Sequence, residues 1–391
     1  MPPERLVTEQ QELDEIILAA RRAGSVALDT EFLREKTYRS RLCLVQIATD
    51  GDLVVVDPLA RIDLGALAAL VSDPGVEVLV HAGRQDFELF YERYGVAPRN
   101  VYDVQLAAGF AGLGASLPYG RLVEELAGAT LQKGEAYTDW CRRPLTDAQL
   151  TYAANDVRYL HDIAAKLKAR LDELGRGAWV AEEMLALEDE TLYATDPAEA
   201  WRRVSGRGSL SSRQTSVLKE LAGWREEAAA RRDLPRGWIV KDPSLVEIAR
   251  RAPKSTSELK AIRGLNAKEA ERSGREILDA VERGRSSPAI ASGPSPPKSA
   301  LMRARMLSGL CDAVLRARCE RASVATEVVA TRGELEALLA DVFSERAREE
   351  DHRLLRGWRR DLAGGAILAL AAGRMAVRVA DAPPYIEEVV L

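Results

Sequence analysis

Short apolar runs, each bounded by Gly, Asp or Pro, are separated by polar breaks over the first 82 residues. Four of these runs are rich in β-branched residues and have the length of strands: SVALDTEF, RLCLVQIAT, DLVVVDP and VEVLVHA. The pair Gly51-Asp52 separates the second run from the third and is a hairpin-type turn signal. The pattern predicts three antiparallel strands followed by an alternation of strand and helix.

From Gln85 onward the apolar positions recur with helical spacing, first in DFELFYERYGV and later in TDAQLTYAANDVRYLHDIAAKLKARL. Thr146 is a good N-cap for the later segment, and Gln149 three residues on completes a capping box. Together with the strands, these helices predict a mixed α/β sheet flanked by helices.

After about Ser205 the chain reads as all-helical, with helices that begin near Ser, Thr or Asn and end near Gly or Pro. The stretch SSPAIASGPSPPKS is dense in Ser, Pro and Gly and is expected to be an exposed linker. We therefore divide the chain into a catalytic domain with its connecting segment (1–206), a helical domain (207–286), a linker (287–299) and a second helical domain (300–391). A Gly-Trp-Arg sequence in each helical part, at 223–225 and 357–359, suggests two copies of one module.

The charge is uneven along the chain. The net charge is −5, but residues 207–285 hold 18 Lys+Arg and 12 Asp+Glu, which gives 18 − 12 = +6 there and −5 − 6 = −11 elsewhere. A basic helical part beside an acidic body fits a nucleic-acid-handling module, although a solvated helical surface is an equal alternative. The polar N-terminus is not a signal peptide and no apolar run has the length of a membrane span, so we expect a cytoplasmic protein, and a monomer, without membrane contact.

Cysteine and histidine usage limits the metal chemistry. The four cysteines are scattered and form no C-x-x-C pair, which argues against a zinc site and against a disulfide framework. With three histidines in the chain, any metal ligands must be mostly carboxylates, which suit Mg²⁺ or Mn²⁺.

Three sequence pieces bring candidate carboxylates. Asp29 and Glu31 are two residues apart on the first predicted strand and so share one face. Asp86 follows the strand that ends at His81 and falls in the first turn of a helix, while Tyr152 and Asp156 lie one turn apart on a later helix. Each piece alone has an ordinary structural explanation, such as exposed acids at a strand end or a helix N-terminus.

The order of the pieces is more specific than any one of them. The sequence D-T-E-F, then H-x-x-x-x-D, then Y-x-x-x-D resembles the tyrosine-containing branch of the DEDD exonucleases, and the chain around them resembles ribonuclease D over roughly residues 1–290. The resemblance also rests on DTEFLREKTYRSRLCLVQIA, LVHAGRQDFELF, LQKGEAYTDWCRRPLTDAQLTYAANDVRYL and DPAEAWRRV. Residues from about 209 to 285 are similar to the helicase-and-RNase-D C-terminal (HRDC) domain, and residues 300–391 faintly resemble a second such domain.

The resemblance implies a ribonuclease H-like fold and a 3′→5′ exoribonuclease that uses two divalent ions, Mg²⁺ or Mn²⁺, to release nucleoside 5′-monophosphates. It implies Asp29 as a ligand to both ions, Glu31 and Asp156 as ligands of the ion that carries the attacking water, and Asp86 as a ligand of the other. Tyr152 would orient the water, because a phenol is too weakly acidic to act as a base at neutral pH. The expected substrate is RNA with a free single-stranded 3′ end, with tRNA precursors as the family's implied target.

Weaker candidates for substrate contacts surround these five residues. They comprise a threonine and a phenylalanine beside the acids, a strand-end histidine, and several cations: Thr30, Phe32, His81, Arg84, Lys133, Arg142 and Arg143. Core packing competes for Phe32, a structural role is favoured for His81, and a solvated surface competes for the cations. Two other functions remain open, a 3′→5′ DNA exonuclease of the same superfamily and a catalytically inactive RNA-binding protein.

Overall fold

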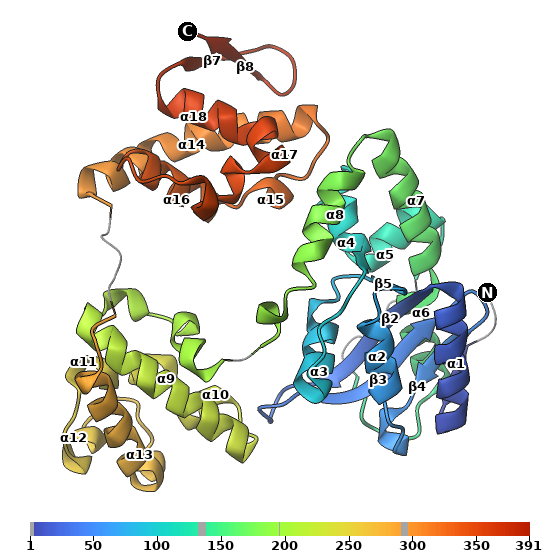
Figure 1. Ribbon diagram of the computed structural model, residues 1–391, viewed down its shortest axis with the longest axis horizontal. Coiled ribbons are helices and arrows are strands. Elements are labelled where there is room, and N and C mark those ends of the chain that lie inside the picture. Colours follow the sequence, from blue (N-terminus) through green and yellow to red (C-terminus); the bar gives the residue numbers. More distant parts are fainter. Residues whose placement is uncertain (1–3, 132–137, 195, 291–295) are drawn as a thin grey trace.

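The computed structural model describes residues 4–131, 138–194, 196–290 and 296–391. An α/β domain, a first helical domain and a C-terminal domain follow one another along the chain (Figure 1). No helix in the described ranges is both long enough and apolar enough to cross a membrane.

A six-stranded mixed sheet forms the centre of the α/β domain, with strand order β1-β4-β3-β2-β5-β6. Its strands are β1 (Arg5–Val7), β2 (Ser25–Leu33), β3 (Arg41–Ala48), β4 (Leu53–Val56), β5 (Glu77–Val80) and β6 (Val101–Asp103). The strands β2, β3 and β4 are antiparallel neighbours, whereas β1, β5 and β6 join in parallel. The four predicted strands and the Gly51-Asp52 turn are confirmed, and the backbone N–H of Thr49 closes that turn on the carbonyl of Asp52.

Helices cover both faces of the sheet. Successive side chains of a strand point to opposite faces, and β2 has apolar side chains on both. Val26 and Leu28 face a core built with α1 (Gln10–Ala23), α2 (Gly65–Val71) and α3 (Arg84–Tyr94). Ala27 faces the opposite core, which contains residues of α4 (Val104–Phe110), α5 (Tyr119–Leu122), α6 (Asp147–Arg158), α7 (Leu160–Glu173) and α8 (Gly177–Ala186). The capping box of Thr146 and Gln149 begins α6 as predicted, but the long predicted helix is divided at Tyr159 into α6 and α7.

Residues 212–286 are helical, and their apolar core also includes Ala200 and Val204 from the preceding segment. The helices of this first helical domain are α9 (Ser212–Arg232), α10 (Arg236–Ile239), α11 (Asp242–Arg251), α12 (Thr256–Lys260) and α13 (Ala267–Ser286). Trp224 is buried in this domain, whereas Trp238 is 60% exposed.

The C-terminal domain is not all-helical, which corrects the prediction for residues 300–391. After α14 (Lys298–Arg321), α15 (Thr326–Val329), α16 (Arg332–Val342), α17 (Gly357–Arg359) and α18 (Gly365–Ala371), the chain ends in an antiparallel hairpin of β7 (Met375–Val379) and β8 (Ile386–Val390). Each strand has five residues, and an ion pair between Arg378 and Glu387 crosses the ladder. Strands of this length are too short to identify from the periodicity of the sequence.

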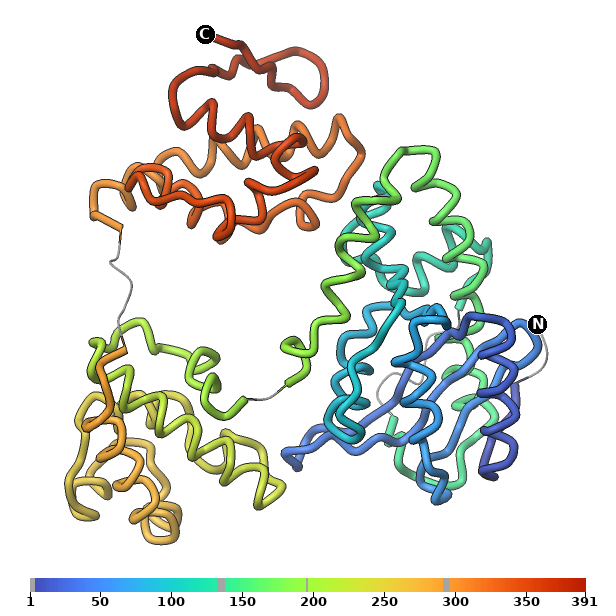
Figure 2. Tube along the Cα trace, in the orientation of Figure 1, coloured from blue at the N-terminus to red at the C-terminus, as the bar shows by residue number. Residues whose placement is uncertain are grey.

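The C-terminal domain also packs directly on the α/β domain and shares its core (Figure 2). The indole of Trp358 stacks on that of Trp179 with ring centroids 4.8 Å apart, and its centroid lies 5.3 Å from that of the Phe110 ring in a T-shaped arrangement. Arg359 pairs with Glu183 of α8 at 2.6 Å. The two domains are therefore joined by aromatic and ionic contacts.

Candidate active site

Strand β2 carries the first two predicted acids on the face that lies against α6. Asp29 is opposite Gln46 of β3 and Glu31 is opposite Leu44, so both share the side of Ala27. The register shifts between Glu31 and Phe32, where a bulge interrupts the pairing. The predicted arrangement of Asp29 and Glu31 on one face is confirmed.

Asp86 is buried in the first turn of α3 and is held by a defined turn. Its carboxylate accepts a hydrogen bond from the hydroxyl of Thr30, so a residue of the acid-bearing strand touches the helix. The preceding Gly83 allows the turn, because a Cβ there would lie 2.6 Å from the side chain of Val80. Asp103 accepts hydrogen bonds from the N–H groups of Ala82 at 3.0 Å and Gly83 at 3.2 Å, which fixes the strand-to-helix turn.

Helix α6 carries Tyr152 and Asp156 one turn apart, and the N-terminal segment anchors it. Arg158 pairs with Glu4 at 2.8 Å, and Thr151 donates to the same carboxylate at 2.6 Å. These contacts lower the pKa of Glu4 to about 2, chiefly through the hydrogen bond from Thr151.

The four carboxylates interact electrostatically, which shows that they share one region. Burial raises the pKa of Asp29 well above its usual range, and the charges of Asp86, Asp156 and Glu31 raise it further. Burial likewise raises the pKa of Glu31 to about 8, with help from Asp156 and Asp86. The pKa of Asp86 rises to about 7 through burial, against the hydrogen bond from Thr30, and burial raises that of Asp156 to about 7.

Tyr152 lies beside this cluster, half-buried. Burial raises the pKa of its phenol to about 12, and the nearby charges of Asp156, Glu31 and Asp29 add to the effect. The hydroxyl therefore stays protonated across the physiological range and remains a hydrogen-bond donor.

The four carboxylates are the kind of ligand that a hard divalent cation prefers, but they do not converge on one position. Carboxylate oxygens are the preferred ligands of Mg²⁺ and Mn²⁺, and a cation would relieve the mutual repulsion of these four groups. Within the described ranges, however, no three Asp, Glu, His or Cys side chains converge closely enough to hold one ion. The four carboxylates therefore suit divalent cations by charge and by donor chemistry, but they are not arranged around an ion in this structure.

Thr30, His81 and Phe32, which were predicted to contact substrate, have different surroundings in the structure. The hydroxyl of Thr30 is occupied by Asp86, and His81 contacts the carbonyl of Leu117 at 3.0 Å and lies 5.4 Å from the Tyr119 ring. Phe32 follows the bulge, is half-buried and belongs to neither core of the sheet. Phe32 stays a prediction as a nucleotide contact, while His81 has a structural partner.

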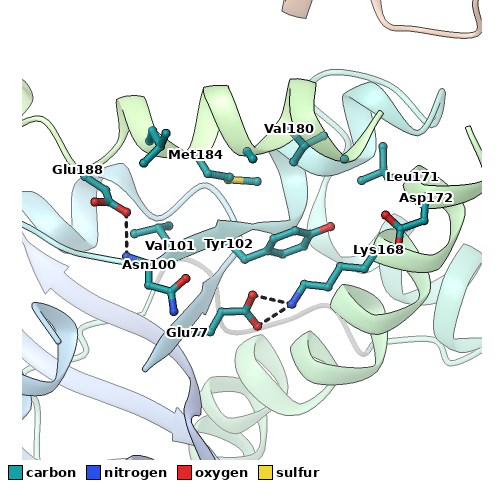
Figure 3. A pocket seen from close by; sticks show the side chains of 13 residues that line it. Glu77, Asn100, Val101, Tyr102, Lys168, Leu171, Asp172, Val180, Met184 and Glu188 are labelled. Carbon is teal, nitrogen blue, oxygen red and sulfur yellow. Dashed lines mark hydrogen bonds and ion pairs between the residues drawn. The ribbon is translucent and has the colours of Figure 1, made fainter. Parts of the chain in front are cut away.

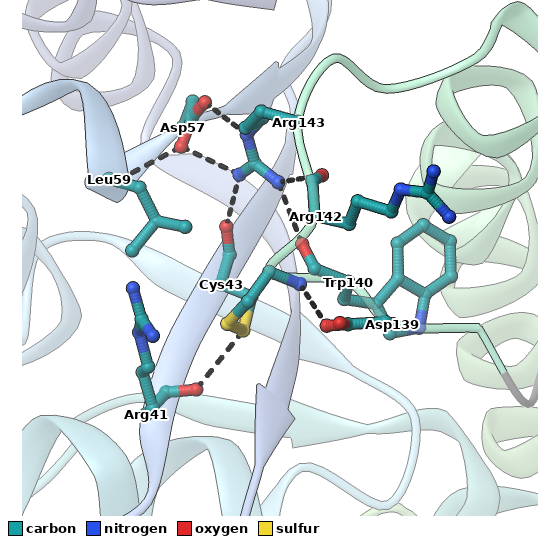
Figure 4. Close-up of a disulfide and its surroundings, with 9 residues drawn as sticks. Arg41, Cys43, Asp57, Leu59, Asp139, Trp140, Arg142 and Arg143 are labelled. Carbon is teal, nitrogen blue, oxygen red and sulfur yellow. Dashed lines mark hydrogen bonds and ion pairs between the residues drawn. A yellow bond between two sulfur atoms is a disulfide. The ribbon is translucent and has the colours of Figure 1, made fainter.

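Among the predicted cations, Arg143 is engaged inside the protein and is not free for phosphate. Its guanidinium pairs with Asp57, with Nε–Oδ2 at 2.5 Å and Nη2–Oδ1 at 2.7 Å, and donates to the carbonyls of Trp140 and Cys43 (Figure 4). Arg142 points away from this group and is exposed, as is Arg84 in the first turn of α3. Lys133 lies outside the described residues.

A disulfide is present, although the scatter of the cysteines along the chain argues against a disulfide framework. Cys43 of β3 and Cys141 are bonded, with their Cα atoms 5.0 Å apart although 98 residues separate them along the chain (Figure 4). Spacing arguments cannot detect such a pair, because the fold rather than the sequence brings the two residues together. The disulfide ties the segment before α6 to the central sheet, while Cys311 and Cys319 remain free and buried.

Tyr119 is a site neighbour that the sequence analysis missed. The charges of Asp156 and Asp29 help to raise its pKa, after burial, so its hydroxyl lies close to both acids. Its oxygen accepts a hydrogen bond from the backbone N–H of Tyr159 at 3.2 Å, at the junction of α6 and α7. No motif contains this residue, because it comes from a separate short helix.

The cavity between β6, α7 and α8 is a different place (Figure 3). It has a volume of about 460 Å³ and is lined by apolar side chains together with Tyr102, the Lys168–Glu77 ion pair and the polar residues Asn100, Asp172 and Glu188. None of the five predicted catalytic residues lines it. The carboxylate cluster, rather than this cavity, is the candidate active site.

Comparisons with known proteins agree with this reading. Residues 5–172 match the family described as 3′-5′ exonuclease, and residues 214–281 match the HRDC domain. The ribonuclease D of Gluconacetobacter diazotrophicus is 39% identical over 388 residues, which cover 97% of this chain and 95% of that protein. The ribonuclease D of Granulibacter bethesdensis is 38% identical and covers the same shares.

The structural comparison extends over almost the whole chain. The crystal structure of Escherichia coli RNase D, described as an exoribonuclease involved in structured RNA processing, is similar with a TM-score of 0.80. The match has 31% sequence identity and covers 94% of this chain and 99% of that one.

Proposed function

Because this chain belongs to the ribonuclease D family, we propose that it is a 3′→5′ exoribonuclease that releases nucleoside 5′-monophosphates from a free 3′-hydroxyl end. The observation that carries the proposal is the cluster of Asp29, Glu31, Asp86 and Asp156, which mutually disfavour their own negative charge. Like charges gathered in a buried place are costly unless a cation or a reaction uses them.

Two divalent ions, Mg²⁺ or Mn²⁺, would be held by these acids. Asp29, Glu31, Asp86 and Asp156 are the residues that would hold them, with their carboxylates drawn closer together around the ions than they lie in this structure. When bound, the ions supply a nucleophilic hydroxide and stabilise negative charge on the leaving oxygen.

The protein's own groups orient the reacting end. The hydroxyl of Tyr152 stays protonated, so it positions the attacking water by donating or accepting a hydrogen bond and does not remove its proton. Thr30 fixes Asp86 through its hydroxyl, and Phe32 is available to meet the terminal base. A single-stranded end fits this site better than a duplex end, because the last base must leave its stack.

The nature of the nucleic acid is the open alternative. A DNA exonuclease would need the same acids, and the sugar is distinguished by contacts to the 2′-hydroxyl. The family name favours RNA, and within RNA we propose tRNA precursors as the physiological class. An inactive RNA-binding protein is disfavoured because all five site residues are retained.

The test is digestion of 5′-end-labelled RNA and DNA of matched sequence with Mg²⁺, with Mn²⁺ and with chelator. We expect a ladder that shortens from the 3′ end, requires metal and is faster on RNA. The same RNA with a 3′-phosphate serves as the matched control and should resist digestion. Cleavage of a circular RNA at a comparable rate would instead identify an endonuclease.

A further inference from the structure

The loop between β2 and β3 is held by the first helical domain. The phenol of Tyr38 donates to Glu226 Oε1 of α9 at 2.7 Å. Asp233, which ends α9, accepts hydrogen bonds on Oδ1 from the backbone N–H groups of Tyr38 and Arg39, both at 3.1 Å. Figure 2 shows this loop reaching from the α/β domain to the end of α9 and α10; we call these four residues the loop–helix contact.

On the helical side of the contact, Asp233 has both an uncommon backbone conformation and an unfavourable position for its charge. Asp233 adopts the left-handed conformation, with φ of 48°, although it is not glycine. Its negative charge also lies at a helix C-terminus, where the helix dipole disfavours it. Strain and unfavourable charge of this kind persist where surrounding contacts fix the residue.

Glu226 is a second uncommon feature of the contact. It is 2% exposed, its nearest cation is Arg236 at 3.5 Å, and its Oε2 atom has no hydrogen-bond partner among the described residues. The ring of Tyr38 packs against the core of the helical domain, so the loop inserts a side chain into that domain. The domains are thus joined by a polar pair and by apolar packing.

This loop continues directly from the strand that carries the catalytic acids. β2 ends at Leu33, two residues after Glu31, and β3 resumes at Arg41 opposite Leu33. The bulge between Glu31 and Phe32 lies between the acids and the loop, and pairing at a bulge is weaker than in a regular ladder. The position of the loop therefore bears on the irregular part of the strand, next to Glu31.

We propose that the loop–helix contact is a positioning device, in which Tyr38, Glu226 and Asp233 hold the β2–β3 hairpin so that Asp29 and Glu31 keep their places. The first helical domain then supports turnover itself, in addition to any binding of RNA. This inference rests on the proposed function for its kinetic consequence, while its structural consequence stands alone.

The kinetic test uses the full chain with Asp233→Ala and Tyr38→Phe on a five-nucleotide RNA, which is too short to need the helical surface. Asp233→Ala removes both hydrogen bonds to the loop, so we expect kcat to fall about tenfold with KM changed less than about twofold. Asp233→Asn keeps the accepting oxygen and should restore most of kcat. Asp279→Ala, at an exposed position on α13 of the same domain, is the matched control.

Hydrogen exchange of the backbone amides in 30–33 and 41–44 provides a readout that does not require activity. Exchange should accelerate in Asp233→Ala and stay at the wild-type rate in Asp279→Ala. If wild-type protein cuts no RNA but the exchange changes as described, the proposed function fails while the positioning role stands. Unchanged kcat with unchanged exchange, a rise confined to KM for long RNA, or a loss in Asp233→Asn equal to that in Asp233→Ala would each overturn the inference.

Discussion

At the scale of single residues, the four acids of the site repel one another, and a bound cation would reduce that repulsion. Glu31, with its pKa near 8, and Asp86 and Asp156, with pKa values near 7, would hold protons at neutral pH in the absence of metal. Metal binding must displace those protons, so protons and metal ions compete for the same oxygens.

This competition predicts how stability depends on pH. An acid whose pKa is raised on folding binds more protons in the folded chain, so its contribution to the free energy of unfolding falls as pH rises from about 4 to about 8. Chelator-treated protein should therefore lose thermal stability relative to Mn²⁺-loaded protein across this range. The difference between the two unfolding midpoints, recorded from about pH 5 to about pH 9, removes contributions common to both, such as that of His161.

Glu31→Gln is the control for this experiment, because it removes one of the acids concerned. In this variant, the difference in unfolding midpoint between chelator-treated and Mn²⁺-loaded protein should depend less on pH than it does in the wild type. A difference that stays constant or shrinks as pH rises would contradict the electrostatic description of the site. Glu4, whose pKa is lowered, loses its stabilising effect only below about pH 4 and lies outside this window.

The acids of the site were predictable from sequence, whereas their supporting contacts were not. Strand periodicity predicts Asp29 and Glu31 on one face, and helical spacing predicts Tyr152 and Asp156 one turn apart, but their selection as site residues came from the order of the motifs that resembles the DEDD exonucleases. The Arg143–Asp57 pair, the Cys43–Cys141 disulfide and Tyr119 depend on residues far apart in the chain. Three-dimensional proximity of that kind leaves no local pattern.

At the scale of elements, long periodic segments were predicted well and very short ones were missed. The capping box at Thr146 and the strands of the central antiparallel part are confirmed. β1 and β6 have three residues each and take their identity from pairing with β4 and β5, which no window of sequence contains. The C-terminal hairpin was missed for the same reason.

Helix α13 carries an element-scale prediction for RNA binding. Lys268, Arg272 and Arg275 are exposed on one face of the helix, four and three residues apart, and none has an ion-pair partner within the described ranges. Replacing all three with alanine should make the dependence of RNA binding on salt shallower. The slope of log K against log salt should fall by about 2, from three phosphates at about 0.7 each on single-stranded RNA.

Binding of a labelled single-stranded RNA at several salt concentrations measures this slope. The matched control replaces three exposed arginines of the α/β domain, Arg22, Arg61 and Arg170, which also lack ion pairs in the described part of the chain. An equal change of slope in both triple variants would show that net charge, rather than α13, is responsible.

At the scale of the whole molecule, the C-terminal domain completes the core of the α/β domain. Trp358 is buried between Trp179 and Phe110, and residues of both domains belong to one apolar cluster. The sequence suggested a separable module with its own boundary at residue 300. The side chains that follow residue 300 therefore pack into the same apolar cluster as those of the α/β domain.

Trp358→Ala should destabilise the protein by about 3–5 kcal/mol, the usual cost of removing a buried tryptophan. Its indole N–H has no hydrogen-bond partner in the described structure, so the loss is of packing and of the contact with the Arg359 guanidinium, which lies 4.2 Å from the ring centroid. Trp238→Ala, at a 60% exposed position, should cost less than about 0.5 kcal/mol. Equal urea midpoints for the two variants would mean that the domains are stable independently.

The most direct test of the central claim is the rate at which Asp29→Asn shortens a 5′-labelled RNA at saturating Mn²⁺, compared with the wild type. The charges of all three other acids raise the pKa of Asp29, which is a proposed metal ligand, and asparagine keeps its size while removing its charge. We predict that the variant keeps its circular dichroism spectrum and loses at least about 99% of the rate, a barrier increase of at least about 2.7 kcal/mol. A folded variant that retains more than about a tenth of the wild-type rate, a change under about 1.4 kcal/mol, would contradict the assignment of the carboxylate cluster as the active site.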